Sequence, residues 1–356
     1  MKKKSFYLAA LAATVVWCGA AAGSVTVTVI DAPSPSQTPS APAGLTPRMS
    51  VAEPTYAVGS GQLALFKAIN ALRQHLGVGL LTQDSRLDTA AQAHAVYLSS
   101  NNVSQHDEAA ENPDFYGVSP LLRARKAGAP AVQWVGEAVA AARGGDDGDI
   151  GQRCFRQWYH TVYHLQSLVG NQESVGVGYS QRGSLGLNLC VLNFGTLTAA
   201  QADPVPNGVP YVGGQHFDAG TFVTVPRSGE TDVQPGFNAE SESPDPAPDL
   251  TAPGRPLMVY ANGALAEILS VGAFNVIGPN GADVPARALV SPAAKAAGSA
   301  GAADPYIRNN AAFLLPLAPL AAGVTYTATF AGTRAGKPVS FTWSFTTSAG
   351  VTIAQR

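Results

Sequence analysis

SVGVGYSQRGSLGLNLCVLNFG, residues 174–195, decides the fold of the first half of the chain. It holds two apolar runs, SVGVGYS and LGLNLCVLNFG, on either side of the turn-like QRGS, and such runs are typical of buried strands. Apolar residues spaced three and four apart predict helices before it. These helical stretches are Leu65–Leu76, Leu87–Leu98 with Asp84 or Ser85 as N-cap, Leu121–Ala127, and one helix carrying Phe155, Trp158, Val162 and Leu165. Helices on both sides of apolar strands predict a layered α/β/α domain over residues 59–199.

The start of the chain has the pattern of an export signal. Three lysines, Lys2 to Lys4, precede an apolar run that ends at Trp17, and small residues follow. This order is typical of a cleaved signal peptide, here residues 1–23, so we expect no membrane anchor after its removal and a secreted or periplasmic protein. The bulky Trp17 before Cys18 argues against lipoprotein anchoring. Residues 24–58 are rich in Pro, Ser and Ala and are expected to form a linker.

Length and composition limit the remaining possibilities. A chain of 356 residues with 46% hydrophobic residues predicts two folded domains. A net charge of −2 with 13% charged residues offers no basic field for phosphates, so we expect no nucleic-acid partner. Cys154 and Cys190 remain after the signal, and they are interpreted either as a disulfide or as two buried thiols.

The second half has a different pattern. In residues 324–330 (VTYTATF) and 339–345 (VSFTWSF), large apolar residues alternate with Ser and Thr, which indicates two half-buried strands joined by a turn. With three further apolar runs, FVTV, PLMVY and FNVIG, they predict an antiparallel β-sandwich over residues 220–350, after a linker at 200–219. The acidic segment 240–250 (ESESPDPAPDL) is interpreted as a solvated loop and not as a calcium site.

Several histidines could carry chemistry. His160 and His164 are four residues apart, on the face of the predicted helix opposite its apolar stripe, which is a spacing that can hold a metal ion. His94 lies in the apolar stripe of its helix and is interpreted as a hydrogen-bonded core residue. His106 lies in a long irregular loop beside Asp107 and Glu108, where an imidazole could act as an acid or base or bind a metal.

The first half resembles the CAP superfamily, also called SCP or pathogenesis-related-1-like proteins, in its bacterial secreted form. The motifs that carry this resemblance are NALR at 70–73, LDTAAQAHA at 87–95, SQH at 104–106, FYGVSPLLRARKAG at 115–128 with Arg123, GEAVA at 136–140, Trp158 six residues before His164, VGVGYS at 175–180, and NFG at 193–195. The second half is similar to bacterial Ig-like modules, which act as spacers or adhesive elements. The fold class is therefore expected to be α+β, a CAP-type α/β/α sandwich followed by an all-β Ig-like sandwich.

The resemblance implies a cleft lined by His106, His164 and Glu137. The family's second glutamate falls on Thr161 and is missing. The usual Ser-Pro-Gly before the second histidine is replaced by Thr161, Val162 and Tyr163, so we expect the helix to continue through His164 and to bring His160 to the cleft rim. His160 and Glu108 are thus secondary candidates.

These groups suggest three alternative functions. Two imidazoles and a carboxylate could hold a divalent metal, Zn or Ca, with His106 and His164 as its ligands, or act as an acid/base pair without a metal. No G-x-S-x-G nucleophile motif is present. The leading hypothesis is an extracellular binding protein for a lipid, a glycan or another cell-surface component. The alternatives are a metal-assisted or acid/base hydrolase, and a surface adhesive or structural protein.

Overall fold

The computed structural model describes residues 45–181, 186–198, 213–217, 220–237, 242–261 and 267–350. The predicted signal peptide, the first linker up to residue 44 and most of the second linker lie outside these residues. The described chain contains both helices and strands, as an α+β protein requires. None of its helices is long and apolar enough to cross a bilayer.

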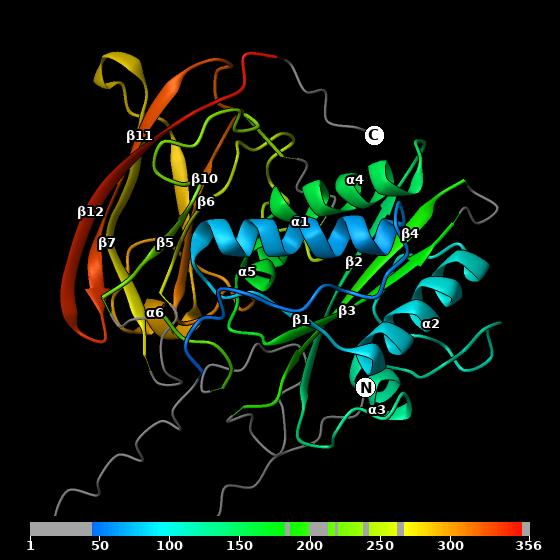
Figure 1. Cartoon of the computed structure of the whole chain (residues 1–356). Helices are drawn as coiled ribbons and strands as arrows, with labels where there is room; N and C mark the ends of the chain where they lie inside the picture. Colours follow the sequence, from blue (N-terminus) through cyan, green and yellow to red (C-terminus); the bar gives the residue numbers. More distant parts are fainter. Residues whose placement is uncertain are drawn as a thin grey trace, which may run out of the picture. The chain divides into compact units, whose positions relative to one another are not determined.

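The first half is built on a four-stranded sheet with the order β1-β3-β4-β2. Its strands are β1 (Thr82–Gln83), β2 (Trp134–Ala142), β3 (Ser174–Ser180) and β4 (Asn188–Thr196). Helices α1 (Gly61–Leu76) and α4 (Asp147–Tyr159) share one apolar core with this sheet, whereas α2 (Ser85–Asn101) and α3 (Pro120–Lys126) belong to separate clusters that include Val191 of β4 and Val135 of β2 (Figure 1). The predicted α/β/α layering is therefore present.

The first two helices begin and end where their capping residues require. The Ser60 side chain accepts a hydrogen bond from the Leu63 amide at the start of α1, and Gly77 ends that helix with a φ of 71°. Asp84, one of the two predicted caps, accepts from the Arg86 amide at the start of α2. Leu65 and Ile69 are fully buried, which confirms the predicted apolar face.

Strand β2 and the two cysteines tie the sheet to α4. The segment around GEAVA forms a strand antiparallel to β4. Cys154 of α4 and Cys190 of β4 form a disulfide, which settles the choice between a disulfide and two free thiols. The crosslink fixes the helix that leads toward His164.

The expected single helix from Phe155 through His164 is wrong. Helix α4 ends at Tyr159, His160 is its C-cap, and a short helix α5 (Tyr163–Leu168) begins after a break. At the break, the Thr161 hydroxyl donates a hydrogen bond to the Trp158 carbonyl. A threonine side chain that bonds nearby backbone in this way competes with the helical hydrogen bonds.

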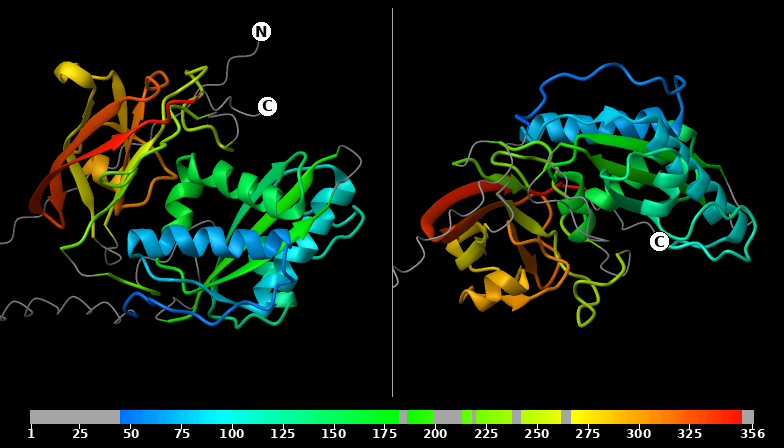
Figure 2. Two further views of the ribbon diagram at one scale, coloured as in Figure 1. Left: turned by 45° about the horizontal axis from the view of Figure 1, so that its top comes forward. Right: turned by 90° about the horizontal axis from the view of Figure 1, so that it is seen from below.

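The second half contains two sheets that share an apolar core. One has the order β5-β6-β10-β8-β9 and the other the order β12-β11-β7. The strands are β5 (Val223–Val225), β6 (Leu257–Tyr260), β7 (Leu269–Ile277), β8 (Ala286–Val290), β9 (Ala302–Ala303), β10 (Ala311–Pro316), β11 (Thr325–Arg334) and β12 (Lys337–Thr346). The predicted hairpin is confirmed, because β11 and β12 pair antiparallel and form the long curved ribbon in orange and red (Figure 2).

One strand pairing in this half departs from a purely antiparallel arrangement. Strands β8 and β9 pair in parallel. The alanine-rich stretch between them contains a short helix, α6 (Pro292–Ala296), which is capped by the Ser291 hydroxyl. A short 3-10 turn, η2 (Pro279–Gly281), follows β7.

Candidate functional site

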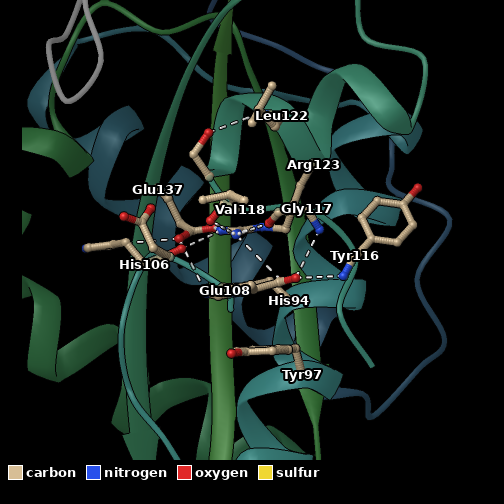
Figure 3. Close-up of polar contacts among 12 residues, drawn as sticks. His94, Tyr97, His106, Glu108, Tyr116, Gly117, Val118, Leu122, Arg123 and Glu137 are labelled. Atoms are coloured by element: carbon tan, nitrogen blue, oxygen red, sulfur yellow. Dashed lines mark hydrogen bonds and ion pairs between the residues drawn. The ribbon is translucent and has the colours of Figure 1, made fainter. Parts of the chain in front are cut away.

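Three side chains from three different elements meet at the surface of the first half (Figure 3). His106 lies on the long loop between α2 and α3, Arg123 on α3, and Glu137 on β2. Nδ1 of His106 lies 2.9 Å from Oε1 of Glu137, and the Arg123 guanidinium donates a 2.7 Å hydrogen bond to Oε2 of the same carboxylate. The His106 side chain is 49% exposed, whereas the other two are essentially inaccessible to solvent. An exposed imidazole is thus oriented by a buried carboxylate and a buried cation.

A second layer lies behind these residues and holds them in place. His94 of α2 is fully buried, which confirms its interpretation as a core histidine. Its Nδ1 lies 2.8 Å from Oε1 of Glu108, and its Nε2 lies 2.9 Å from the Gln105 carbonyl. Nε2 is also 3.6 Å from the Glu137 carboxylate. His94 therefore connects the loop that carries His106 to the carboxylate that orients it.

Glu108 explains why the irregular loop is ordered. Its Oε2 accepts hydrogen bonds from the backbone amides of Tyr116 and Gly117, and its side chain is fully buried. The Arg123 guanidinium donates to the carbonyls of His106 and Gly117. Glu108, a secondary site candidate from the sequence, is thus placed inside the fold, where it holds the loop backbone at Tyr116 and Gly117.

The charges around His106 shift its titration and that of Glu137. Burial alone would lower the pKa of His106, but the hydrogen bond to Glu137 and the charge of that carboxylate outweigh burial and raise this pKa above its usual value. Burial would raise the pKa of Glu137, but its hydrogen bond with His106 and the charge of Arg123 lower it overall. Glu137 is therefore ionised near neutral pH, and Nδ1 of His106 donates to it.

His164 belongs to a different group of contacts. Its Nδ1 lies 2.9 Å from Oε1 of Glu242 and 3.2 Å from the Thr161 hydroxyl. The same Glu242 carboxylate accepts hydrogen bonds from the backbone amides of Val162 and His164, both at 2.8 Å. The contacts of His164 therefore lie with α5 and the second half of the chain, while those of His106 lie with Glu137.

Glu242 corrects the interpretation of the acidic segment 240–250 as a solvated loop. This glutamate is buried and lies against the first residues of α5. Sequence reasoning missed it because nothing local distinguishes it from its acidic neighbours. Its partners lie about eighty positions earlier in the chain.

His160 does not form the metal pair that its spacing from His164 suggested. The break after α4 removes the common helical face that the argument required. Its ring packs 5.4 Å from that of Tyr159. Burial lowers the pKa of His160 well below its usual value, and the positive charges of Arg255 and Arg156 lower it further, so this imidazole is neutral near pH 7.

The side chains present do not fit the expected divalent metal. Within the described ranges, no group of three or more His, Cys, Asp and Glu side chains could hold a metal ion. Glu137 already pairs with a guanidinium through one oxygen and with His106 through the other. A metal at this position would have to displace the imidazole or approach the cation of Arg123. His106 and Glu137, which we call the dyad, are better suited to accept or donate a proton than to bind Zn or Ca.

Comparisons with known proteins match one segment of the chain. Residues 66–194 match the family model described as CAP, the cysteine-rich secretory protein family. None of the curated proteins compared matches the chain at a significant level. Two of the solved structures that are similar to this chain each cover 38% of it.

The first of these structures is an outer surface protein of Borrelia burgdorferi, with 20% identity, a TM-score of 0.32 and 91% of its own chain covered. The second is an extracellular protein of Bacillus anthracis containing an SCP domain, with 21% identity, a TM-score of 0.31 and 39% of its chain covered. This chain therefore spans well under half of the Bacillus protein. The segment 66–194, which carries His94, His106, Arg123, Glu137 and His164, is a CAP domain.

Proposed function

We propose that this protein is an exported CAP-domain binding protein that takes up an extracellular ligand at the exposed imidazole of His106. The observation that carries the proposal is the layered support of this imidazole. Glu137 holds Nδ1, Arg123 holds Glu137, and about half of the His106 side chain faces solvent. A surface histidine without a binding or catalytic role needs no buried carboxylate and guanidinium behind it.

The chemistry of the site favours a ligand with an anionic group. Glu137 binds Nδ1, so Nε2 is the nitrogen that remains for a partner. The raised pKa of His106 keeps the imidazole protonated to a higher pH than usual, so that Nε2–H can donate to an anion. Such a group could belong to an acidic lipid headgroup or an acidic glycan at a cell surface.

The test compares the full chain with His106→Ala and with His75→Ala, an exposed histidine on α1 that serves as a matched control. The probes are phosphatidylglycerol vesicles, phosphatidylcholine vesicles and soluble polygalacturonate. We expect at least one anionic probe to bind, with affinity roughly tenfold lower for His106→Ala and unchanged for His75→Ala. Equal binding by all three proteins would overturn the proposal.

A second candidate is acid/base hydrolysis. An imidazole whose Nδ1 is held by a carboxylate has the orientation that a general base requires, with Nε2 free to take a proton from water. No serine, threonine or cysteine in the described ranges hydrogen-bonds to His106, which favours water as the nucleophile. Turnover of ester, peptide or cell-wall substrates that disappears in Glu137→Gln would support this candidate over simple binding.

For the second half we propose an Ig-like module. Its two sheets share an apolar core, and its closing hairpin has the alternation found in such modules. An adhesive role for this half is the third possibility. Retention of the full chain on cells that is unaffected by His106→Ala would favour adhesion, and loss of retention in that variant would favour the CAP site.

A further inference from the structure

A groove of about 680 Å³ lies on the CAP domain, and neither His106 nor Glu137 is among its lining residues. It is open to solvent and is bounded by α1, β1, α2, the edge of β3 and the loop before α3. We name it the edge groove and define it by Tyr56, Gln62, Gln83, Asp88, Gln92 and Phe115, which are among its lining residues. Its volume is in the range of small-ligand sites.

The floor of the edge groove is a strand edge whose backbone is already satisfied by side chains. Asp88 accepts a 2.8 Å hydrogen bond from the Val177 amide. Gln92 accepts from the Tyr179 amide at 3.1 Å and donates to the Tyr179 carbonyl at 2.9 Å. A peptide could not add here as a further strand, because that mode needs free backbone donors and acceptors.

The polar side chains of the groove are fixed by one another. Asp88 accepts from the Tyr56 hydroxyl at 2.5 Å and from the Gln83 amide at 2.6 Å. The Gln62 amide donates to Gln92 at 3.3 Å. Each side-chain amide nitrogen carries two hydrogens, and these contacts use one of them, so a second donor on each is available to a ligand. Groups held in this way lose little freedom on binding.

Charge and polarity narrow the class of ligand. The lining includes the carboxylates of Asp88 and Asp114 but no Lys, Arg or His, which disfavours an anionic ligand. The lining also has apolar side chains such as Val96 and Phe115, but a bare hydrocarbon chain would cover Asp88 and the side-chain amides without pairing with them, which disfavours it. A cation is also a poor match, because Asp88 already accepts from three donors, Tyr56, Gln83 and Val177. A neutral ligand rich in hydroxyl groups remains.

We propose that the edge groove is a binding site for a neutral glycan. Side-chain amides and carboxylates pair well with adjacent sugar hydroxyls, and the ring of Phe115 offers an apolar surface for the C–H face of a sugar. The site is independent of the function proposed for His106, because it shares no residue with the dyad. The protein would then have two separate ligand sites on one CAP domain.

The experiment is a calorimetric titration of the full chain with three neutral trisaccharides: maltotriose, cellotriose and triacetylchitotriose. Trigalacturonic acid serves as the anionic comparison. We expect saturable binding of at least one neutral probe, weakened at least tenfold in Phe115→Ala and in Gln62→Ala and unchanged in His106→Ala. Thermal denaturation checks that each variant is folded.

Three outcomes would overturn the proposal. The first is that no neutral probe binds at concentrations up to about 10 mM, a limit that already corresponds to very weak affinity. The second is that trigalacturonic acid binds as well as the neutral probes and that this binding is weakened by Phe115→Ala but not by His106→Ala, which would assign an anionic ligand to the edge groove. The third is that His106→Ala weakens binding as much as Phe115→Ala, which would assign the sugar to the dyad and would leave the function proposed for His106 standing.

Discussion

Two histidine–carboxylate pairs in this protein are assembled in different ways. His106 and Glu137 both belong to the CAP domain, and Arg123 of the same domain supports the carboxylate. His164 also belongs to the CAP domain, but its partner Glu242 comes from the second half of the chain, 78 positions later. The first pair is a property of one domain, whereas the second pair requires both halves. The second half is therefore part of the structure around His164.

Other contacts support this difference. Near α5, the Tyr163 hydroxyl donates to Asp304, and Arg308 donates to the Gln166 carbonyl at 2.7 Å. Arg255 donates to the Tyr159 carbonyl, and its guanidinium lies 4.4 Å from the centre of the Tyr159 ring. No comparable contact from the second half reaches His106 in the described ranges, where the loop is held by Glu108 and Arg123.

The largest loss of unfolding free energy is expected from Arg123→Ala, which tests the pair that lies within the CAP domain. The substitution removes a fully buried cation and leaves the Glu137 carboxylate buried beside the imidazoles of His94 and His106. Breaking a buried ion pair on one side costs about 3–5 kcal/mol of unfolding free energy. Chemical denaturation of the full chain measures this loss. Lys126→Ala, on the same helix but exposed, is the control and is expected to cost less than about 1 kcal/mol.

If Arg123→Ala fails to fold, Arg123→Lys provides the test. It keeps the charge but not the fork of donors that reaches the carbonyls of His106 and Gly117. We expect an intermediate loss of stability. A cost below about 1 kcal/mol for either substitution would show that Arg123 does not support the dyad.

The next effect is expected from Glu242→Ala. This change removes the acceptor for two backbone amides of α5 and the partner of His164. Hydrogen bonds to a charged group contribute about 1.5–3 kcal/mol, and the orphaned buried amide of Val162 adds a penalty. We expect a loss of about 2–3 kcal/mol in denaturation of the full chain. Glu111→Ala, at an exposed site, should leave stability unchanged, and an equal effect of both variants would contradict the role of Glu242.

Local patterns were sufficient to predict the first helices, and the resemblance to the CAP superfamily supplied Glu137 of the first pair. The apolar spacing at Leu65 and Ile69 and the cap at Asp84 are properties of short segments, so α1 and α2 could be predicted. The motifs around His106 and Glu137 pointed to residues that do meet. The helix break after Tyr159 could not be predicted from spacing alone, because it depends on the competing contact made by Thr161 and on Glu242.

The residues behind the dyad show a second limit of sequence patterns. Arg123 appeared only as part of a motif, and its role depends on three segments that converge in space. His94 was correctly interpreted as buried, but its contact with Glu108 was not predicted. Periodicity indicates that a side chain points inward, but it does not identify the polar partner found there.

A smaller effect is expected in double-mutant cycles on the two pairs. His164 is 17% exposed and His106 is 49% exposed, so solvent screens the contact between His106 and Glu137 more strongly than the contact between His164 and Glu242. For His164→Ala with Glu242→Gln we expect a coupling free energy of about 1 kcal/mol. For His106→Ala with Glu137→Gln we expect roughly half of that. The four single and double variants are compared by denaturation at one pH, and a larger coupling for the His106 pair would reverse the ranking by exposure.

The smallest expected effect is the pH dependence contributed by His106. The folded state raises the pKa of this imidazole, so it holds the proton more tightly than the unfolded chain does. The resulting stabilisation is complete below the ordinary histidine pKa of about 6.5 and is lost as the pH rises through the raised value. Glu137→Gln removes the charge that raises this pKa, so the decline in stability from about pH 6 to pH 8 should become shallower than in the wild type.

NMR titration of the imidazole would follow the same change as a fall in the pKa of His106, with His75→Ala as the control. A pKa of His106 that is the same in Glu137→Gln and in the wild type would mean that Glu137 orients the imidazole without tuning its charge, and the pH-dependent capture of an anionic ligand would then lose its basis.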